Sequence, residues 1–151
     1  MSLCMDRSAV AYFTNGKLIF APIIRTTSGL GLEVDPVALD PTSEGRAYAN
    51  AISEALDSST RVVPHPSQDQ WKGFFEPFQK AAGVRSHKAF MKDAVRVSIR
   101  ATDDLFELTP QRNLGTKGGF EEIPEAALIL SPGDLDGAAR ALKDMLALNG
   151  S

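Results

Sequence analysis

The dipeptide Asn15-Gly16 constrains this chain more than any other feature of its sequence. It separates two largely apolar segments, Ala9–Phe13 and Lys17–Ile24. Both residues tolerate the positive φ angles that a type I′ turn requires at its two central positions. The sequence therefore predicts that the chain opens with an antiparallel β-hairpin.

Alternating hydrophobic residues predict further strands in residues 29–34, 95–99, 106–108 and 126–130. A two-residue turn at Thr102-Asp103 would place Ile99 opposite Phe106 and, by the same register, Val97 opposite Leu108. In that pairing, Arg96, Arg100 and Glu107 lie on the other face of the sheet, available to water or to a partner. The glycine-rich residues 111–120 are expected to form a mobile loop.

Three helices are predicted from periodicity and capping signals. The first is capped by Asp40 and carries an apolar face from Tyr48 to Leu56. The second opens at Ser67 with a capping box and closes at Gly83. It carries the aromatic residues Trp71, Phe74, Phe75 and Phe78. The third follows a cap at Ser131-Pro132, and residues 86–92 are expected to form a single helical turn.

The predicted elements do not alternate regularly between strand and helix. Strands cluster at the start of the chain and again after Ala94, with helices between them and at the end. This order favours an α+β fold with a mixed or antiparallel sheet and about three helices packed on it. We expect one domain over residues 1–151, with residues 1–8 flexible.

Composition excludes several classes of protein. The chain has 151 residues, is 43% hydrophobic and 23% charged, and carries a formal net charge of -3. These values are those of a globular protein and exclude a disordered or collagen-like chain. The single cysteine, Cys4, cannot form an intramolecular disulfide. The apolar runs are shorter than the roughly 20 residues of a membrane-spanning helix, so we expect a cytoplasmic protein.

The charge is unevenly distributed along the chain. Residues 1–60 carry a net charge of -3, residues 61–120 carry +4 and residues 121–151 carry -4. The basic residues Arg85, Lys88, Lys92, Arg96 and Arg100 concentrate in the middle segment. The acidic residues Glu121, Glu122 and Glu125 open the last segment, and their predicted loop supplies no structural reason for Glu121 and Glu122. These three glutamates, with Arg96 and Arg100, are therefore candidate partner-binding residues.

No catalytic or metal-binding motif is present. Gly29 and Gly31 lack the third glycine and the strand–helix context of a dinucleotide site. The two histidines, His65 and His87, are isolated from each other and from Cys4, so a zinc site is not expected. We therefore expect neither a metal nor a cofactor.

The order of features from about Gly29 onward resembles the contact-dependent growth inhibition immunity proteins of bacteria. The segment Gly83–Met91, which follows the aromatic helix, and the opening of the last helix, Ser131–Leu142, carry most of this resemblance. The strand pair between them and the helix ending at Ser59 agree with it. Trp71, Gly83, Phe90 and the face of Ala138, Ala139 and Leu142 resemble structural positions of the family.

The resemblance implies a non-enzymatic, cytoplasmic protein. Its partner would be the cognate toxin domain of a CdiA-type effector, often a nuclease, which it would bind and block. The family's toxin contacts vary, so the resemblance assigns none to this sequence. It implies no membrane and no direct nucleic-acid contact, and we expect a monomer or weak dimer.

Two other functions stay open at this stage. The basic segment 85–100 is typical of a nucleic-acid-binding or regulatory module. A small hydrolase using His65 or His87 would require one of them to meet a carboxylate in a pocket.

Overall fold

The computed structural model describes residues 7–29, 31–40, 42–67, 76–92, 94–102, 104–115 and 119–147. The strands are β1 (Arg7–Thr14), β2 (Lys17–Thr26), β3 (Gly31–Glu33), β4 (Val37–Leu39), β5 (Val62–Val63), β6 (Val95–Ala101), β7 (Phe106–Asn113), β8 (Phe120–Glu122) and β9 (Leu128–Leu130). The helices are α1 (Gly45–Ser58), α3 (Glu76–Ala82), α4 (His87–Met91) and α5 (Leu135–Ala147), with a 3₁₀ turn η1 (Pro124–Ala126).

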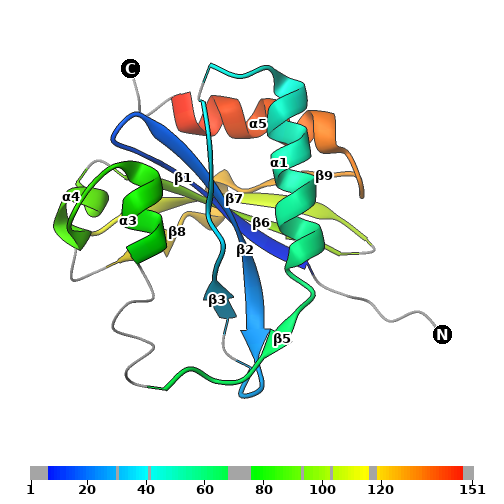
Figure 1. The fold of residues 1–151 in the computed structure, drawn as a ribbon. Coiled ribbons are helices and arrows are strands. Elements are labelled where there is room, and N and C mark those ends of the chain that lie inside the picture. The colour runs from blue at the N-terminus through cyan, green and yellow to red at the C-terminus, as the bar shows by residue number, and fades with distance from the viewer. Residues whose placement is uncertain are drawn as a thin grey trace.

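All the strands belong to one curled sheet, whose main path runs β3-β2-β1-β6-β7-β8. Strands β4 and β5 also pair with the long strand β2, and β9 pairs with β7. Every pairing is antiparallel except that of β5 with β2. The predicted α+β class, with a mixed sheet and helices packed on it, is confirmed (Figure 1).

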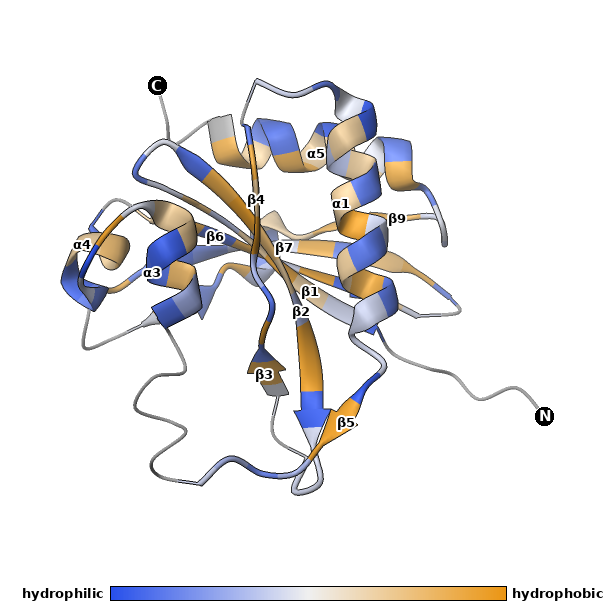
Figure 2. Ribbon diagram, viewed as in Figure 1, coloured by the Kyte–Doolittle hydropathy of each residue, from blue (hydrophilic) through white to orange (hydrophobic). Residues whose placement is uncertain are grey.

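Helices cover both faces of the sheet. Helices α1 and α5 pack together on one face, over a core that includes Phe20, Ile52 and Leu142. Helices α3 and α4 pack on the other face, where Tyr12 and Phe78 are buried. Figure 2 shows the consequence for the central strands, in which hydrophobic residues dominate β1 and β2. A strand covered on both faces has no solvated side, and so the polar alternation disappears.

The opening hairpin forms as predicted. Asn15 and Gly16 adopt φ angles of 52° and 72° between β1 and β2, and Thr14 pairs with Lys17. The Asn15 side chain also donates a 2.8 Å hydrogen bond to the carbonyl of Ala82. The turn therefore serves the tertiary structure as well, by tying the hairpin to the end of α3.

The predicted start of the first helix is wrong. The carboxylate of Asp40 accepts hydrogen bonds from the backbone N–H and hydroxyl of Thr42, at 2.9 and 2.7 Å. These hydrogen bonds form a turn, lower the pKa of Asp40, and leave α1 to begin at Gly45. The preceding residues 37–39 instead form β4 along the edge of β2, a strand too short to show periodicity.

The register predicted for the second hairpin is wrong by two residues. Ile99 lies opposite Leu108, and Val97 lies opposite Pro110. The turn between Ala101 and Phe106 has four residues instead of two. It is closed by a 2.9 Å hydrogen bond from the backbone N–H of Thr102 to the carbonyl of Leu105. A shift of two residues keeps every side chain on its predicted face.

Other boundaries also differ from the prediction. Residues 111–113 and 120 belong to strands rather than to a loop, and β9 is preceded by η1. Helix α5 begins at Leu135 instead of following Ser131 directly, because Asp134 accepts the backbone N–H of Gly137 at 3.0 Å. Arg7 and Ser8, expected to be flexible, open β1. Residues 1–6 and residues 68–75 lie outside the described residues. The latter hold the predicted first turns of the second helix and its aromatic residues Trp71, Phe74 and Phe75.

Candidate functional site

The three predicted glutamates lie at the outer side of β7. Glu121 and Glu122 belong to β8, Glu125 to η1, and all three are exposed. We call these three residues the acidic ridge. Glu121 forms an ion pair of 3.2 Å with Arg112, in which both side chains are more than half exposed. Glu121 and Glu122 therefore belong to the sheet, where they point to opposite faces of β8, although the sequence predicted a loop. Glu125 follows them in η1.

Arg100 lies on the sheet face that its alternation predicted. It pairs with Glu107 of β7, which in turn pairs with Ile129 of β9. Side chains directly opposite each other share a face, so the three form a row across three strands. Arg100 is exposed, and the side chain of Ile129 is 61% exposed. This row places a cation and an apolar side chain on neighbouring strands.

Arg96 does not share this exposure. Its guanidinium donates to Glu33 at 2.5 Å and to the hydroxyl of Tyr12 at 3.1 Å, and it also contacts Gln111. The side chain of Arg96 is 14% exposed and that of Glu33 is 25% exposed. The sequence predicted the face of Arg96 correctly. Its ion pair with Glu33, however, leaves the Arg96 side chain largely buried, whereas the other candidate residues are exposed.

The Arg96 network, which comprises Tyr12, Glu33, Arg96 and Gln111, joins strands that are distant in the sheet. Glu33 belongs to β3, at one end of the sheet path, whereas Gln111 belongs to β7. The guanidinium carbon of Arg96 lies 5.5 Å from the centre of the Tyr12 ring and 5.8 Å from that of Phe120. A cation at this distance from aromatic rings gains a favourable interaction with their faces. The network therefore links four strands across the curl of the sheet.

The hydroxyl of Tyr12 donates to Glu33 at the centre of this network. Burial, reinforced by the charge of Glu33, raises the pKa of Tyr12 far above its ordinary value of 10.0. A phenolate at this position would lose its solvation and face a carboxylate. Tyr12 therefore stays neutral in the folded protein over the ordinary pH range.

We expect this shift to make the fold sensitive to alkali. The native pKa of Tyr12 is higher than the unfolded one, so the corresponding stability is present below pH 10 and decreases as the pH rises above it. Urea unfolding between pH 8 and 12 should show a steeper loss of stability for the wild-type protein than for Tyr12→Phe. Equal slopes in the two proteins would contradict this assignment.

Of the four residues in the network, the sequence indicated only Arg96 as a candidate, and the charged residue that it did not indicate is Glu33. It stands between Leu32 and Val34 in a segment predicted as a strand, and alternation placed it opposite their face. Its partner lies on β6, more than sixty residues away in the sequence. A single charged residue in a short apolar strand could have indicated that Glu33 has a buried partner. The sequence does not show that this partner is Arg96.

The two histidines lie far apart in the sequence, at the segment after β5 and at the start of α4. Both are exposed, and the Nδ1 atom of His65 lies 2.9 Å from the hydroxyl of Ser28. His87 opens α4, where Arg85, Lys88 and Lys92 are also exposed. Among the described residues, no cluster of three or more His, Cys, Asp or Glu side chains is arranged to hold a metal ion. No helix in the described ranges has the length and hydrophobicity to cross a membrane.

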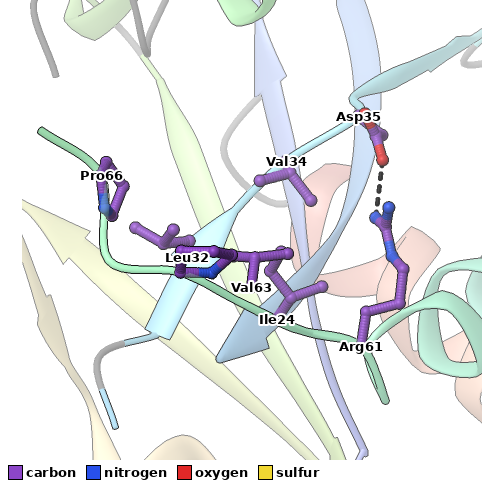
Figure 3. A pocket seen from close by; sticks show the side chains of 8 residues that line it. Ile24, Leu32, Val34, Asp35, Arg61, Val63 and Pro66 are labelled. Carbon is purple, nitrogen blue, oxygen red and sulfur yellow. Dashed lines mark hydrogen bonds and ion pairs between the residues drawn. The ribbon is translucent and has the colours of Figure 1, made fainter. Parts of the chain in front are cut away.

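The end of β2 carries a hollow of about 360 Å³ (Figure 3). Its walls are mainly apolar and come from β2, from β3 and the residue after it, and from β5 and the segment that follows it: Ile24, Leu32, Val34, Val63, Pro64 and Pro66. Arg61 and Asp35 close one side through an ion pair of 2.6 Å, drawn as a dashed line in Figure 3. A second, smaller hollow of about 150 Å³, between β4 and α1, is also lined by Asp35. The ion pair therefore lies at the boundary of the two hollows, where Asp35 lines both of them.

Comparison with known proteins places the chain in a class by its fold. No family model matches the sequence, and no curated protein matches it. Solved structures do share its curled sheet and flanking helices over almost its whole length. The class is therefore an α+β domain defined by its architecture rather than by sequence similarity.

Two solved structures define this class more closely. One is a protein of unknown function from Neisseria meningitidis, with a TM-score of 0.72 and 16% identity over 99% of this chain and 96% of that chain. The other is a chain of the CdiA-CT/CdiI toxin and immunity complex from Yersinia pseudotuberculosis. It has a TM-score of 0.73 and 11% identity over 96% of this chain and 97% of that chain. At these identities the likeness establishes the fold.

Proposed function

We propose that this protein is an immunity protein that binds and neutralises the toxin domain of a contact-dependent growth inhibition effector. The observation that carries the proposal is the likeness to a chain of a toxin and immunity complex, which spans 97% of that chain. The sequence resemblance in Gly83–Met91 and Ser131–Leu142 points to the same family by a separate route.

The surface of the chain is suited to the inhibitor's part in such a complex. The sheet carries exposed charged side chains, among them Arg100, Glu121 and Glu122, and the two histidines are also exposed. An inhibitor acts by occupying its target, and it needs complementary charge and shape rather than a reactive group. We therefore assign the chain the role of a binding protein.

The acidic ridge is the surface that we propose for the toxin. A toxin that cleaves nucleic acid must present a basic groove to the phosphate backbone, and a carboxylate surface can compete for that groove. Glu107 adds a fourth carboxylate on the neighbouring strand β7, and Ile129 opposite it on β9 supplies an apolar side chain of the kind that can anchor an interface. The proposed surface thus combines acidic charge with one apolar contact.

Reversing the charge of the ridge should slow association with the toxin. The triple variant Glu121→Lys, Glu122→Lys and Glu125→Lys is expected to reduce the association rate constant at least about tenfold at low salt. Surface plasmon resonance with the toxin domain of a candidate effector, sought beside the gene of this protein, measures that constant. All three side chains are exposed, so the fold should tolerate the change.

A matched control separates the position of the charges from their number. Glu44, Glu54 and Glu76 are also exposed but lie at the cap of α1, within α1 and on α3. Changing these three residues to lysine alters the net charge by the same amount. If both variants slow association equally, the ridge is not the binding surface. If neither binds differently from wild type, the toxin contacts another part of the protein.

A further inference from the structure

A basic hollow lies between the start of α1 and one side of α5. It measures about 490 Å³ and is lined by Gly45, Arg46, Asp136, Ala139, Arg140 and Lys143. Three of these six residues are cations, and they come from two helices that are distant in the sequence but packed together. Asp136 is the single acid in the lining.

The cations of the basic hollow have no acidic partners within the described parts of the chain. Arg46, Arg140 and Lys143 are absent from the four ion pairs found there. The Nζ atom of Lys143 lies 4.9 Å from the centre of the Tyr48 ring, which holds the ammonium group at the hollow. Three cations set against the single carboxylate of Asp136 leave an excess of positive charge in the hollow, and a bound anion would offset that excess.

The cations of the basic hollow come from parts of the sequence that are acidic on balance. Residues 121–151 contain six acidic residues and two basic ones, and both basic residues, Arg140 and Lys143, line the hollow. Arg46 joins them from the acidic first part of the chain. The basic segment 85–100, which sequence analysis singled out, contributes no residue to the lining.

We propose that the basic hollow binds a polyphosphate. Guanidinium groups pair with phosphate oxygens through two parallel hydrogen bonds, and a flexible ammonium group adds a third point of positive charge. The small residues Gly45 and Ala139 leave room for several phosphate groups between the cations. The lining offers no large apolar side chain, so the ligand is held by charge rather than by burial of an aromatic base. This site is separate from the acidic ridge and does not depend on the proposed function.

Thermal unfolding tests the site with sodium tripolyphosphate as the probe. At a concentration about ten times its Kd, and at constant ionic strength, tripolyphosphate should raise the Tm of the full chain by about 3 °C. The variant Arg46→Gln, Arg140→Gln and Lys143→Gln should lose this response while keeping the far-UV circular dichroism of the folded protein. Raising the salt concentration should weaken binding, because mobile ions screen the charges.

The matched control removes three cations elsewhere. Arg85, Lys88 and Lys92 are exposed on and around α4, and their replacement by glutamine should leave the Tm shift intact. An equal loss in both variants, or no shift in the wild type, would overturn the proposal. Parallel titrations with ATP and with a short single-stranded RNA identify the source of the phosphate chain. Binding of the RNA without binding of tripolyphosphate would also overturn it.

Discussion

Replacing Arg96 with Met is expected to lower the free energy of unfolding by about 3 kcal/mol. The substitution keeps an apolar stem of similar length but leaves the carboxylate of Glu33, which is 25% exposed, without its cation. An uncompensated charge in a partly buried position loses solvation without recovering a partner. Gln111 and Tyr12 would lose a hydrogen-bond partner as well. Urea unfolding measures the difference.

A second substitution distinguishes the charge from the packing. Changing Glu33 to Met in the Arg96→Met background removes the orphaned carboxylate and should restore at least half of the lost stability. The exposed pair of Arg112 and Glu121 provides the comparison, since Arg112→Met should cost less than about 0.5 kcal/mol. If Arg96→Met costs no more than Arg112→Met, the network does not stabilise the fold as described.

Replacing Phe90 with Ala should destabilise the protein by about 4 kcal/mol. The side chain is fully buried, and its ring centre lies 5.2 Å from that of Tyr12 in an edge-to-face arrangement. Its backbone carbonyl accepts a 2.7 Å hydrogen bond from the hydroxyl of Thr14, so α4 is also attached to the hairpin there. The substitution would leave a cavity between α4 and the sheet, which is detected by urea unfolding.

An exposed apolar residue is the appropriate control for this loss. Val62 of β5 is 65% exposed, so Val62→Ala should change stability by less than about 0.5 kcal/mol. Phe90→Leu, which keeps much of the volume, should fall between the two. A loss below about 1 kcal/mol for Phe90→Ala would show that α4 packs only loosely against the sheet.

Local signals predicted the parts of the fold that depend on neighbouring residues. Asn15-Gly16 predicted the opening hairpin because its turn requires positive φ angles. The periodic face of α5, including Ala138, Ala139 and Leu142, is buried as expected. Gly83 ends α3 as predicted, with a φ angle of 74°.

Errors arose where a distant segment decided the local structure. Residues 37–39 form a strand because the edge of β2 is available to pair with them. Residues 111–113 continue β7 because they pair with β8, and Gln111 also pairs with Arg96 of β6. The Asn113 side chain further attaches this end of β7 to the carbonyls of Met91 and Ala94. No local pattern encodes either partner.

The residues of the candidate site likewise include some that local sequence signals predicted and others that depend on distant segments. Exposure of the acidic ridge follows from its composition and could be predicted. The burial of Arg96 could not, because it depends on Glu33 approaching across the curl of the sheet. The basic hollow depends on the packing of α1 against α5, which brings Arg46 to Arg140 and Lys143. Side chains joined by tertiary structure are identified only once the fold is known.

Growth rescue tests the proposed immunity function most directly. The C-terminal toxin domain of a candidate CdiA-type effector, sought beside the gene of this protein, is expressed in bacteria from an inducible promoter, with and without this protein. The account predicts that the toxin alone arrests growth, that co-expression restores it, and that the two proteins co-purify as a complex. Continued growth arrest, with this protein folded and in excess over the toxin, would contradict the account.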